Sequence, residues 1–185
     1  MSYYFIGKNP VVDLLMVRTH PDDGLQALLI KRSASCDAEA GKFALTGGFR
    51  DTDAQKDQLF DSGKYQEPAL DAAIRECAEE TSIDTSKLSQ HIKLIGVYTG
   101  PGRDPRETSE RFSESHAFFL SLDGLMSITK SDALVAQEGE IDDVKWVKWS
   151  DLMQMHLAFD HNKICFDAQH FIASPLRMDR NKPKF

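Results

Sequence analysis

The sequence predicts one α/β domain built on a mixed β-sheet. Its 185 residues are enough to enclose a hydrophobic core, and no internal repeat or linker divides them. Apolar runs of strand length alternate along the chain with segments of helical periodicity. The apolar fraction of 41% is ordinary for a globular protein. We therefore expect residues 1–185 to form a single domain.

The N-terminal part of the chain predicts a β-hairpin. Residues 11–17 and 26–31 are apolar runs of strand length, and they flank the turn sequence HPDDG. A shorter strand is expected at 42–45, and it runs directly into the pair Gly47-Gly48.

The polar residues 50–66 have little periodicity, and we interpret them as a surface excursion. The clearest helix follows, from Glu67-Pro68 to Thr81-Ser82. Proline suits the first helical position because its missing N–H would have no partner there. Five residues with helical spacing predict one buried stripe, namely Leu70, Ala73, Ile74, Cys77 and Thr81.

Three further strands are expected in the second half of the chain, at 92–98, 116–122 and 143–149. The charged segment up to Ser115 is expected to be a loop between the first two of them.

The C-terminal segment predicts two helices and a tail. Ser150 and Asp151 are candidates to cap a short helix. A last helix is expected from about 160 to 174, because Pro175 would stop it. The basic tail from about 176 is expected to be loose.

Charge and cysteine content narrow the classes of function. The net charge of −7 argues against binding to nucleic acid or anionic membranes. No apolar run approaches the roughly 18 residues that cross a bilayer. Three cysteines, Cys36, Cys77 and Cys165, form no CxxC pair and favour a reduced cytoplasmic setting. An anionic substrate would require metal ions or a local basic patch to offset the acidic surface.

The expected helix gathers three carboxylates on the face opposite its apolar stripe. Glu76, Glu79 and Glu80 share that face at about 100° per residue. Glu76 and Glu80 are like charges four residues apart, which is unfavourable on a helix. Glu79 and Glu80 also lie in the last turn, where the helix dipole disfavours anions. Arg75 offsets only part of this repulsion. Carboxylate oxygens without nearby histidine or cysteine suit Mg²⁺ or Mn²⁺. A solvated acidic helix face is the alternative interpretation.

The segment resembles the signature of the Nudix hydrolase family, Gx5Ex7REUxEExGU, in which U is aliphatic. Glu67 is followed, after seven residues, by the sequence RECAEETSI, which begins at Arg75. Gly47-Gly48-Phe49 lies upstream, in the order that the family uses. The resemblance implies the Nudix fold, an α/β/α sandwich with a mixed sheet. It also implies magnesium-dependent hydrolysis, with manganese as a possible substitute, of a pyrophosphate bond in a nucleoside diphosphate linked to another group.

Three departures from this signature are visible. Eighteen residues separate Gly48 from Glu67 where the family has five, so thirteen extra residues lie in the segment 50–66. Ser82 stands where the family prefers glycine, and Thr46 replaces the usual proline. Ser82 would have to adopt the left-handed, helix-ending conformation that glycine takes more easily.

The resemblance assigns roles to the residues of the helix. It implies that Glu76 and Glu80 are the main metal ligands, that Glu79 supports a further ion, and that Arg75 orients the glutamates. Glu67 would support the ligands from the start of the helix.

The remaining roles fall on loop residues. A backbone carbonyl near Gly47 or Gly48 would complete the metal shell. The general base is expected just before a late strand, where Glu140 fits and Glu138 is its rival. A polar turn without a catalytic role remains the alternative for both glutamates.

The sequence also contains clues to the substrate. Arg103 and Arg106, in the turn RDPR, could grip phosphate bidentately, although a salt-bridged surface loop is equally open. With residues 157–161 and the Gly48-Phe49 segment, this turn looks like the ADP-ribose pyrophosphatase branch of the family. That likeness implies hydrolysis of ADP-ribose to AMP and ribose 5-phosphate, with Gly48 and Phe49 near the substrate.

Other readings of the branch stay open. NADH, a nucleotide sugar or a dinucleoside polyphosphate could be the substrate, or the domain could sense ADP-ribose without catalysis. In the branch's transcriptional regulators a DNA-binding domain follows, and too few residues remain here for one, so no nucleic-acid partner is expected. Members of the family with this activity are often homodimers.

Overall fold

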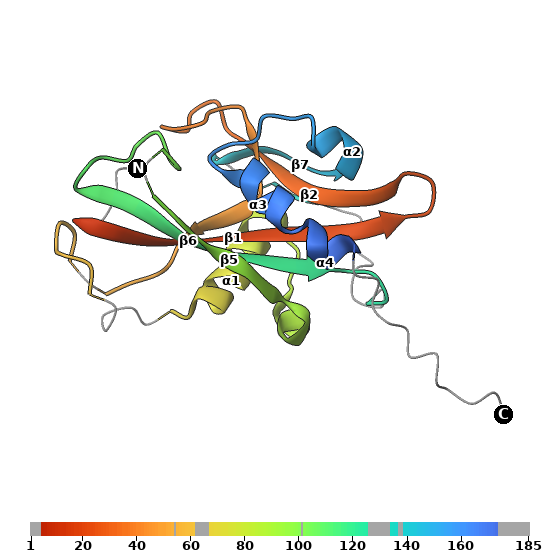
Figure 1. Ribbon diagram of the computed structural model, residues 1–185, viewed down its shortest axis with the longest axis horizontal. Coiled ribbons are helices and arrows are strands. Elements are labelled where there is room, and N and C mark those ends of the chain that lie inside the picture. Colours follow the sequence, from red (N-terminus) through yellow and green to blue (C-terminus); the bar gives the residue numbers. More distant parts are fainter. Residues whose placement is uncertain are drawn as a thin grey trace.

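A computed structural model of the protein describes residues 5–53, 55–61, 67–100, 102–125, 134–136 and 139–173 (Figure 1). The strands of the described part are β1 (Gly7–His20), β2 (Gly24–Arg32), β3 (Phe43–Ala44), β4 (Thr46–Phe49), β5 (Lys93–Thr99), β6 (Arg111–Ser121) and β7 (Ile141–Lys148). The helices are α1 (Ala69–Thr81), the 3-10 helix η2 (Ser86–His91), α2 (Trp149–Leu152), α3 (His161–Asp167) and α4 (Gln169–Ala173).

Strand β1 is the centre of a mixed sheet. It pairs in parallel with β6, from Gly7 opposite Arg111 to Val17 opposite Ser121. Its other edge pairs antiparallel with β2 and with β4. Beyond these neighbours, β5 pairs with β6, and both β3 and β7 pair with β2. The expected mixed sheet and its N-terminal hairpin are confirmed.

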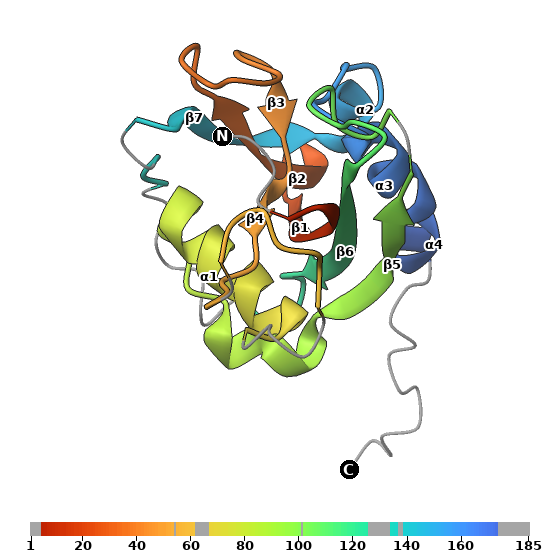
Figure 2. The same cartoon turned by 90° about the vertical axis from the view of Figure 1, so that its left-hand side faces the viewer.

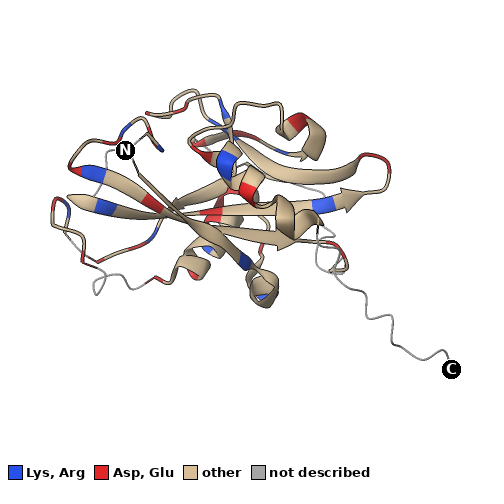
Figure 3. Ribbon diagram, viewed as in Figure 1, with Lys and Arg blue, Asp and Glu red and all other residues tan. Residues whose placement is uncertain are grey.

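Helices cover both faces of this sheet. The side chains of β1 alternate between the two faces, so each face contributes apolar side chains to a core of its own. Val12, Leu14 and Met16 pack on the side of α1, whereas Leu15 and Val17 pack on the side of α3. Figure 2 shows α1 on one side of the strands and α3 and α4 on the other. The expected α/β/α sandwich is thereby confirmed. Charged residues lie mainly in loops and at strand ends (Figure 3).

Several expected boundaries differ from those observed. The segment before Ser115, expected to be a loop, is the first part of β6, because pairing with β1 extends that strand back to Arg111. Pro68 precedes α1 instead of opening it, although its carbonyl accepts the N–H of Ala72 as a helix cap does. The expected last helix is divided into α3 and α4 at Ala168.

The expected cap of α2 is also wrong. Ser150 and Asp151 lie inside this helix, which begins at Trp149, and no side-chain cap bond is formed at Lys148. The neighbouring hydroxyl and carboxylate of Ser150 and Asp151 bond to one another instead.

The polar excursion after β4 is anchored to the N-terminus of the chain. Ile6 forms a parallel bridge with Leu59, and the Phe5 and Phe60 rings meet edge to face at 6.0 Å. Residues 54 and 62–66 of this excursion, Glu138 and the tail from 174 lie outside the described residues. In the described part, no helix is both long and apolar enough to cross a bilayer.

Candidate active site

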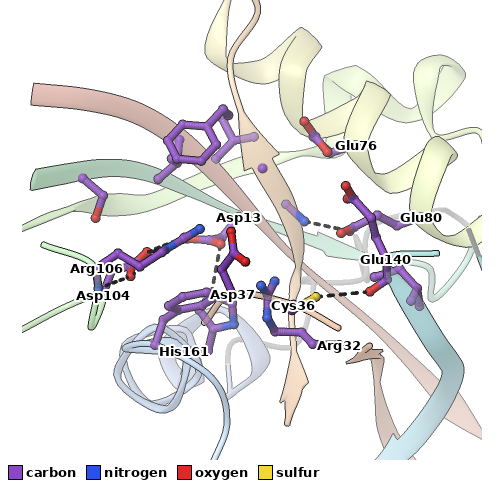
Figure 4. Close-up of a pocket in the computed structure, with 18 of the residues that line it drawn as sticks. Asp13, Arg32, Cys36, Asp37, Glu76, Glu80, Asp104, Arg106, Glu140 and His161 are labelled. Atoms are coloured by element: carbon purple, nitrogen blue, oxygen red, sulfur yellow. Dashed lines mark hydrogen bonds and ion pairs between the residues drawn. The ribbon is translucent and has the colours of Figure 1, made fainter. Parts of the chain in front are cut away.

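A cavity of about 490 Å³ opens where α1, β4 and the loops around the N-terminal half of β1 meet (Figure 4). It contains most of the residues singled out from the sequence. Its lining includes Gly47, Gly48, Phe49, Glu76, Glu80, Arg103, Arg106 and Glu140. The lining also includes six residues that were not among the predicted site residues, namely Asp13, Arg32, Cys36, Asp37, Phe159 and His161.

Helix α1 brings two of its glutamates against strand β4. The backbone N–H of Gly47 donates to Glu80 Oε2 at 2.9 Å. A Cβ atom on Gly48 would lie 2.5 Å from the Glu76 carboxyl, so only glycine admits Glu76 at this distance. The absence of a side chain at Gly48 therefore creates the space for the Glu76 carboxylate.

The orientation of these glutamates follows from how α1 is packed and ended. Ala73 and Cys77 are buried in the core on one side of the helix. Glu80 is only 7% exposed because β4 covers it, so the alternative of a solvated acidic face does not hold for this residue. Ser82 ends the helix in the left-handed conformation, with φ of 61°, as the sequence predicted.

The two carboxylates are hard to ionise where they lie. Burial raises the pKa of Glu80 well above its ordinary value, the Gly47 N–H opposes this, and the charge of Glu76 adds to it. Burial likewise raises the pKa of Glu76, although Arg75 opposes that shift. A cation between them would remove most of this penalty.

Arg75 organises the acidic residues around it. Its Nε and Nη2 donate to the two oxygens of Glu67 at 2.8 and 3.0 Å, and its Nη1 donates to Glu76 Oε1 at 2.8 Å and to Glu79 Oε2 at 3.2 Å. The bond to Glu67 leads the causes that raise the pKa of Arg75. The side chain of Glu79 is 48% exposed and directed to Arg75, outside the cavity lining.

The donor set of the cavity fits a divalent cation. The buried Glu80 and the partly buried Glu76 present carboxylate oxygens to the same space (Figure 4), and such oxygens are the donors that hard divalent cations prefer. Among the described residues, no three side chains of His, Cys, Asp or Glu form a preassembled metal cluster, because Glu79 is turned to Arg75. The carboxylates of Glu76 and Glu80 are thus the principal candidate ligands.

Glu140 lies at the cavity, immediately before β7, as expected. Its carbonyl accepts the backbone N–H of Ser33 at 2.9 Å and the thiol of Cys36 at 3.6 Å. The loop after β2 therefore fixes the backbone from which the Glu140 carboxylate extends.

Arg103 is enclosed in a buried ionic network that the sequence analysis missed. Its guanidinium donates to Asp13 Oδ2 at 2.7 Å, contacts Asp160 at 3.0 Å and donates to Ser113 Oγ at 3.0 Å. Burial opposes ionisation of Asp13, but contacts with His161 and Arg103 outweigh it and hold its pKa well below its usual range. The guanidinium that was expected to grip phosphate is therefore already neutralised by protein carboxylates.

His161 completes this network in a fixed tautomer. Its Nδ1 accepts the backbone N–H of Leu45 at 3.0 Å and so carries no proton. Its Nε2 donates to Asp13 Oδ1 at 3.0 Å. The sequence did contain a clue, since Asp13 is a lone charge in the apolar run VVDLLMV.

The other two arginines of the cavity differ in their partners. Arg106 pairs with Asp104, with Nη2 and Oδ2 2.6 Å apart. Arg32 donates from Nε to the carbonyl of Ala38 at 3.1 Å, and it has no ion pair within 4.0 Å among the described residues. Its position at the end of an expected strand gave no reason to single it out. Figure 4 shows Arg32 at the cavity between Arg106 on one side and Glu80 and Glu140 on the other.

Comparison with known proteins agrees with this geometry. The family model of the NUDIX domain matches residues 8–167. Over 141 residues the chain is 30% identical to an ADP-ribose pyrophosphatase of Methanocaldococcus jannaschii. The match covers 76% of this chain but 63% of that relative, so the chain spans less than two thirds of its length.

Two solved structures share the fold. One is the NUDIX domain of Shewanella oneidensis NrtR in complex with ADP-ribose, with a TM-score of 0.65, 24% identity and coverage of 89% of this chain and 88% of that one. The other is a bifunctional NMN adenylyltransferase/ADP-ribose pyrophosphatase of Francisella tularensis with AMP and a manganese ion. Its TM-score is 0.65 at 21% identity, covering 90% of this chain and 42% of that one. The fold, the helix with its paired glutamates and the extent of the family match place this chain in the Nudix family.

Proposed function

We propose that the protein is a divalent-metal-dependent pyrophosphohydrolase that cleaves ADP-ribose to AMP and ribose 5-phosphate. The observation that carries the proposal is that one cavity contains the carboxylates of Glu76 and Glu80 and an arginine, Arg32, that has no carboxylate partner among the described residues. A nucleoside diphosphate bridged by a metal complements both features. The likeness to an ADP-ribose pyrophosphatase supports the choice of substrate.

Glu76 and Glu80 would hold the metal, with magnesium as the expected ion and manganese as a substitute. The cation would neutralise charge that develops on the phosphates and lower the pKa of a bound water. Arg75 keeps Glu76 in place, and the Gly47 N–H keeps Glu80 in place. Glu79 would serve a further ion only after it leaves Arg75.

The general base of the proposed reaction is Glu140, because it lies on the cavity and its backbone is fixed by Ser33. It would accept the proton of the attacking water. Arg32 and Arg106 would contact the phosphates, while Phe49 and Gly48 line the space beside them. We assign to Arg103 the holding of the cavity wall, because its guanidinium is buried between the Asp13 and Asp160 carboxylates, whereas Arg106 is more exposed and pairs with Asp104.

A non-catalytic ADP-ribose-binding module is the second candidate. It is favoured by the likeness to the NrtR domain in complex with ADP-ribose and by the position of Glu79 away from the cavity. The two functions differ in product formation, since only the enzyme releases AMP.

The test is a panel of ADP-ribose, NADH, nucleotide sugars and dinucleoside polyphosphates, each with Mg²⁺ or Mn²⁺, with the products separated by chromatography. We expect ADP-ribose to give AMP and ribose 5-phosphate. Glu80→Gln, which keeps an acceptor for the Gly47 N–H, should reduce turnover by at least about 100-fold without unfolding the protein. Undiminished turnover in this variant would refute the metal site. Binding of ADP-ribose without product at any metal concentration would favour the sensing module.

A further inference from the structure

The backbone of Phe159 is in an unusual conformation at the edge of the cavity. Its φ is 55°, in the left-handed region that bulky side chains rarely adopt. It is one of the cavity-lining residues and lies just before α3. Strained residues of this kind persist only where their surroundings impose the conformation, and they are frequent at ligand sites.

The residues on both sides of Phe159 impose its conformation. The Ala158 N–H donates to the Phe43 carbonyl at 2.8 Å. Asp160 is ion-paired with Arg103 at 3.0 Å, and His161 is held between Leu45 and Asp13. The buried ionic network therefore fixes the direction in which the Phe159 ring points.

The ring of Phe159 lies beside two of the cavity's arginines. Its centroid is 5.0 Å from the guanidinium carbon of Arg32 and 5.8 Å from that of Arg106. Both distances are within the range of cation–π attraction. Within the described part of the chain, the Arg32 guanidinium lies against this ring and donates from Nε to the Ala38 carbonyl.

The arginine end of the cavity faces the carboxylate end. Figure 4 places Arg106 on one side of the cavity, Glu76 and Glu80 on the other, and Arg32 between them. The positive charge of Arg32 acts on Glu80 and favours the ionised form of its carboxyl. Without another contact, the Arg32 guanidinium would be attracted to the Glu76 and Glu80 carboxylates. A contact that keeps it away from them therefore affects which groups it can bind.

We propose that Phe159 is a positioning residue that holds the guanidinium groups of Arg32 and Arg106 toward the phosphates of a nucleoside diphosphate. The inference rests on the proposed function and identifies the diphosphate as the recognised part of the substrate. The aromatic ring attracts the two cations through its face, and the rigid backbone at Phe159 keeps the ring from following them. An aliphatic side chain at this position fills the space but does not attract the cations.

Calorimetric titration with inorganic pyrophosphate in metal-free buffer tests the proposal on arginine contacts alone. Phe159→Leu should weaken pyrophosphate binding about threefold to tenfold, whereas Phe159→Tyr, which keeps an aromatic ring, should bind within about twofold of the unmodified protein. Phe43→Leu is the matched control. The Phe43 ring lies 4.2 Å from the Lys145 ammonium but does not line the cavity, so this variant should bind as the unmodified protein does.

A double-mutant cycle separates positioning from packing. If Phe159 acts through Arg32, Phe159→Leu should have little further effect in an Arg32→Gln background. With a hydrolysed substrate, Phe159→Leu should raise KM and leave kcat nearly unchanged. Circular dichroism and thermal unfolding confirm that each variant is folded. If Phe159→Leu does not fold, the Tyr variant and Arg32→Gln, which should weaken pyrophosphate binding by a similar factor, decide the question.

Pyrophosphate binding that Phe159→Leu leaves unchanged would overturn the proposal. Equal losses in the Leu and Tyr variants, additive effects in the cycle or no pyrophosphate binding by the unmodified protein would do the same. Pyrophosphate binding with these effects, but without hydrolysis of any nucleotide, would refute the proposed function and leave this inference intact.

Discussion

Two adjacent glycines, Gly47 and Gly48, form the part of the cavity wall that lies against Glu76 and Glu80. A Cβ atom on Gly47 would lie 2.1 Å from the carbonyl oxygen of Val12, which is backbone and cannot give way. A Cβ atom on Gly48 would meet only the carboxyl of Glu76, the mobile end of a side chain. Gly47 is therefore required for the close approach of β4 to β1, and Gly48 is required for the position of the Glu76 carboxyl.

Gly48→Ala should consequently separate activity from stability. The new methyl group would displace the Glu76 carboxylate and reduce metal affinity and turnover about tenfold or more. Because only the end of a side chain moves, the free energy of unfolding should fall by less than about 1 kcal/mol. Manganese titration and urea unfolding measure the two effects.

Gly96→Ala is the control for this substitution. The nearest atom to a Cβ at Gly96 is a Tyr98 ring carbon at 3.5 Å, an ordinary contact, and Gly96 lies on β5, away from the cavity. The Gly96→Ala variant should therefore have the same metal affinity as the unmodified protein. Equal metal affinity in Gly48→Ala and the unmodified protein would contradict the role given to Gly48.

At the scale of elements, helix α1 is the part of the candidate site that was best predicted from its local sequence. Spacing alone predicted the helix, its buried Cys77 and the partial compensation of its glutamates by Arg75, because all of these lie within a few turns of one helix. Its end at Ser82 was also foreseen, together with the conformation that the serine has to adopt.

The end of α1 offers a stability test. Ser82→Gly should raise the free energy of unfolding by about 0.5–1 kcal/mol, because glycine adopts a φ of 61° without steric cost and loses only part of this gain to chain entropy. Urea unfolding measures the change. Ser86→Gly is the control, since the backbone of Ser86 does not have a positive φ and glycine there should not stabilise. A Ser82→Gly variant no more stable than the original would show that the terminus carries no strain.

Strand boundaries were less accessible to sequence reasoning than the helix. The start of β6 reads as a charged loop, yet it extends to Arg111 because β1 provides a parallel partner along that whole length. The shared edge of β1, where β2 and β4 both pair, likewise depends on contacts that no local pattern encodes.

The whole molecule combines a net charge of −7 with a cavity meant, on our proposal, for an anion. The burial of Glu76 and Glu80 adds a cost to the folded state when both ionise. Metal binding and protein stability should therefore be linked, and the linkage should depend on pH.

The direction of this dependence follows from the raised pKa of Glu80. Glutamate has an ordinary pKa of 4.5, and a carboxyl with a higher pKa in the folded state stabilises the fold below that value. This contribution is lost as the pH rises through the folded value. A fixed concentration of Mg²⁺ or Mn²⁺, about 100 times its Kd at pH 8, should raise Tm by roughly 5–10 °C at pH 8 and much less at pH 5, where the metal competes with protons.

Glu80→Gln should remove most of this increment, and the metal-free variant should be more stable at pH 8 than the metal-free original. Scanning calorimetry with and without EDTA measures both effects. The linkage would be disproved by an equal metal-induced rise in Tm for the variant and the original protein.

The sequence by itself determined the mixed α/β fold, helix α1 and the family, because periodicity and residue spacing act within short segments. The tertiary structure alone decided which charges face the cavity. Asp13 neutralises Arg103 across 90 residues of sequence, and β4 buries Glu80. Arg32 and Phe159 meet at the cavity for the same reason. Such contacts depend on strand pairing between distant segments, and no local pattern of residues carries that information.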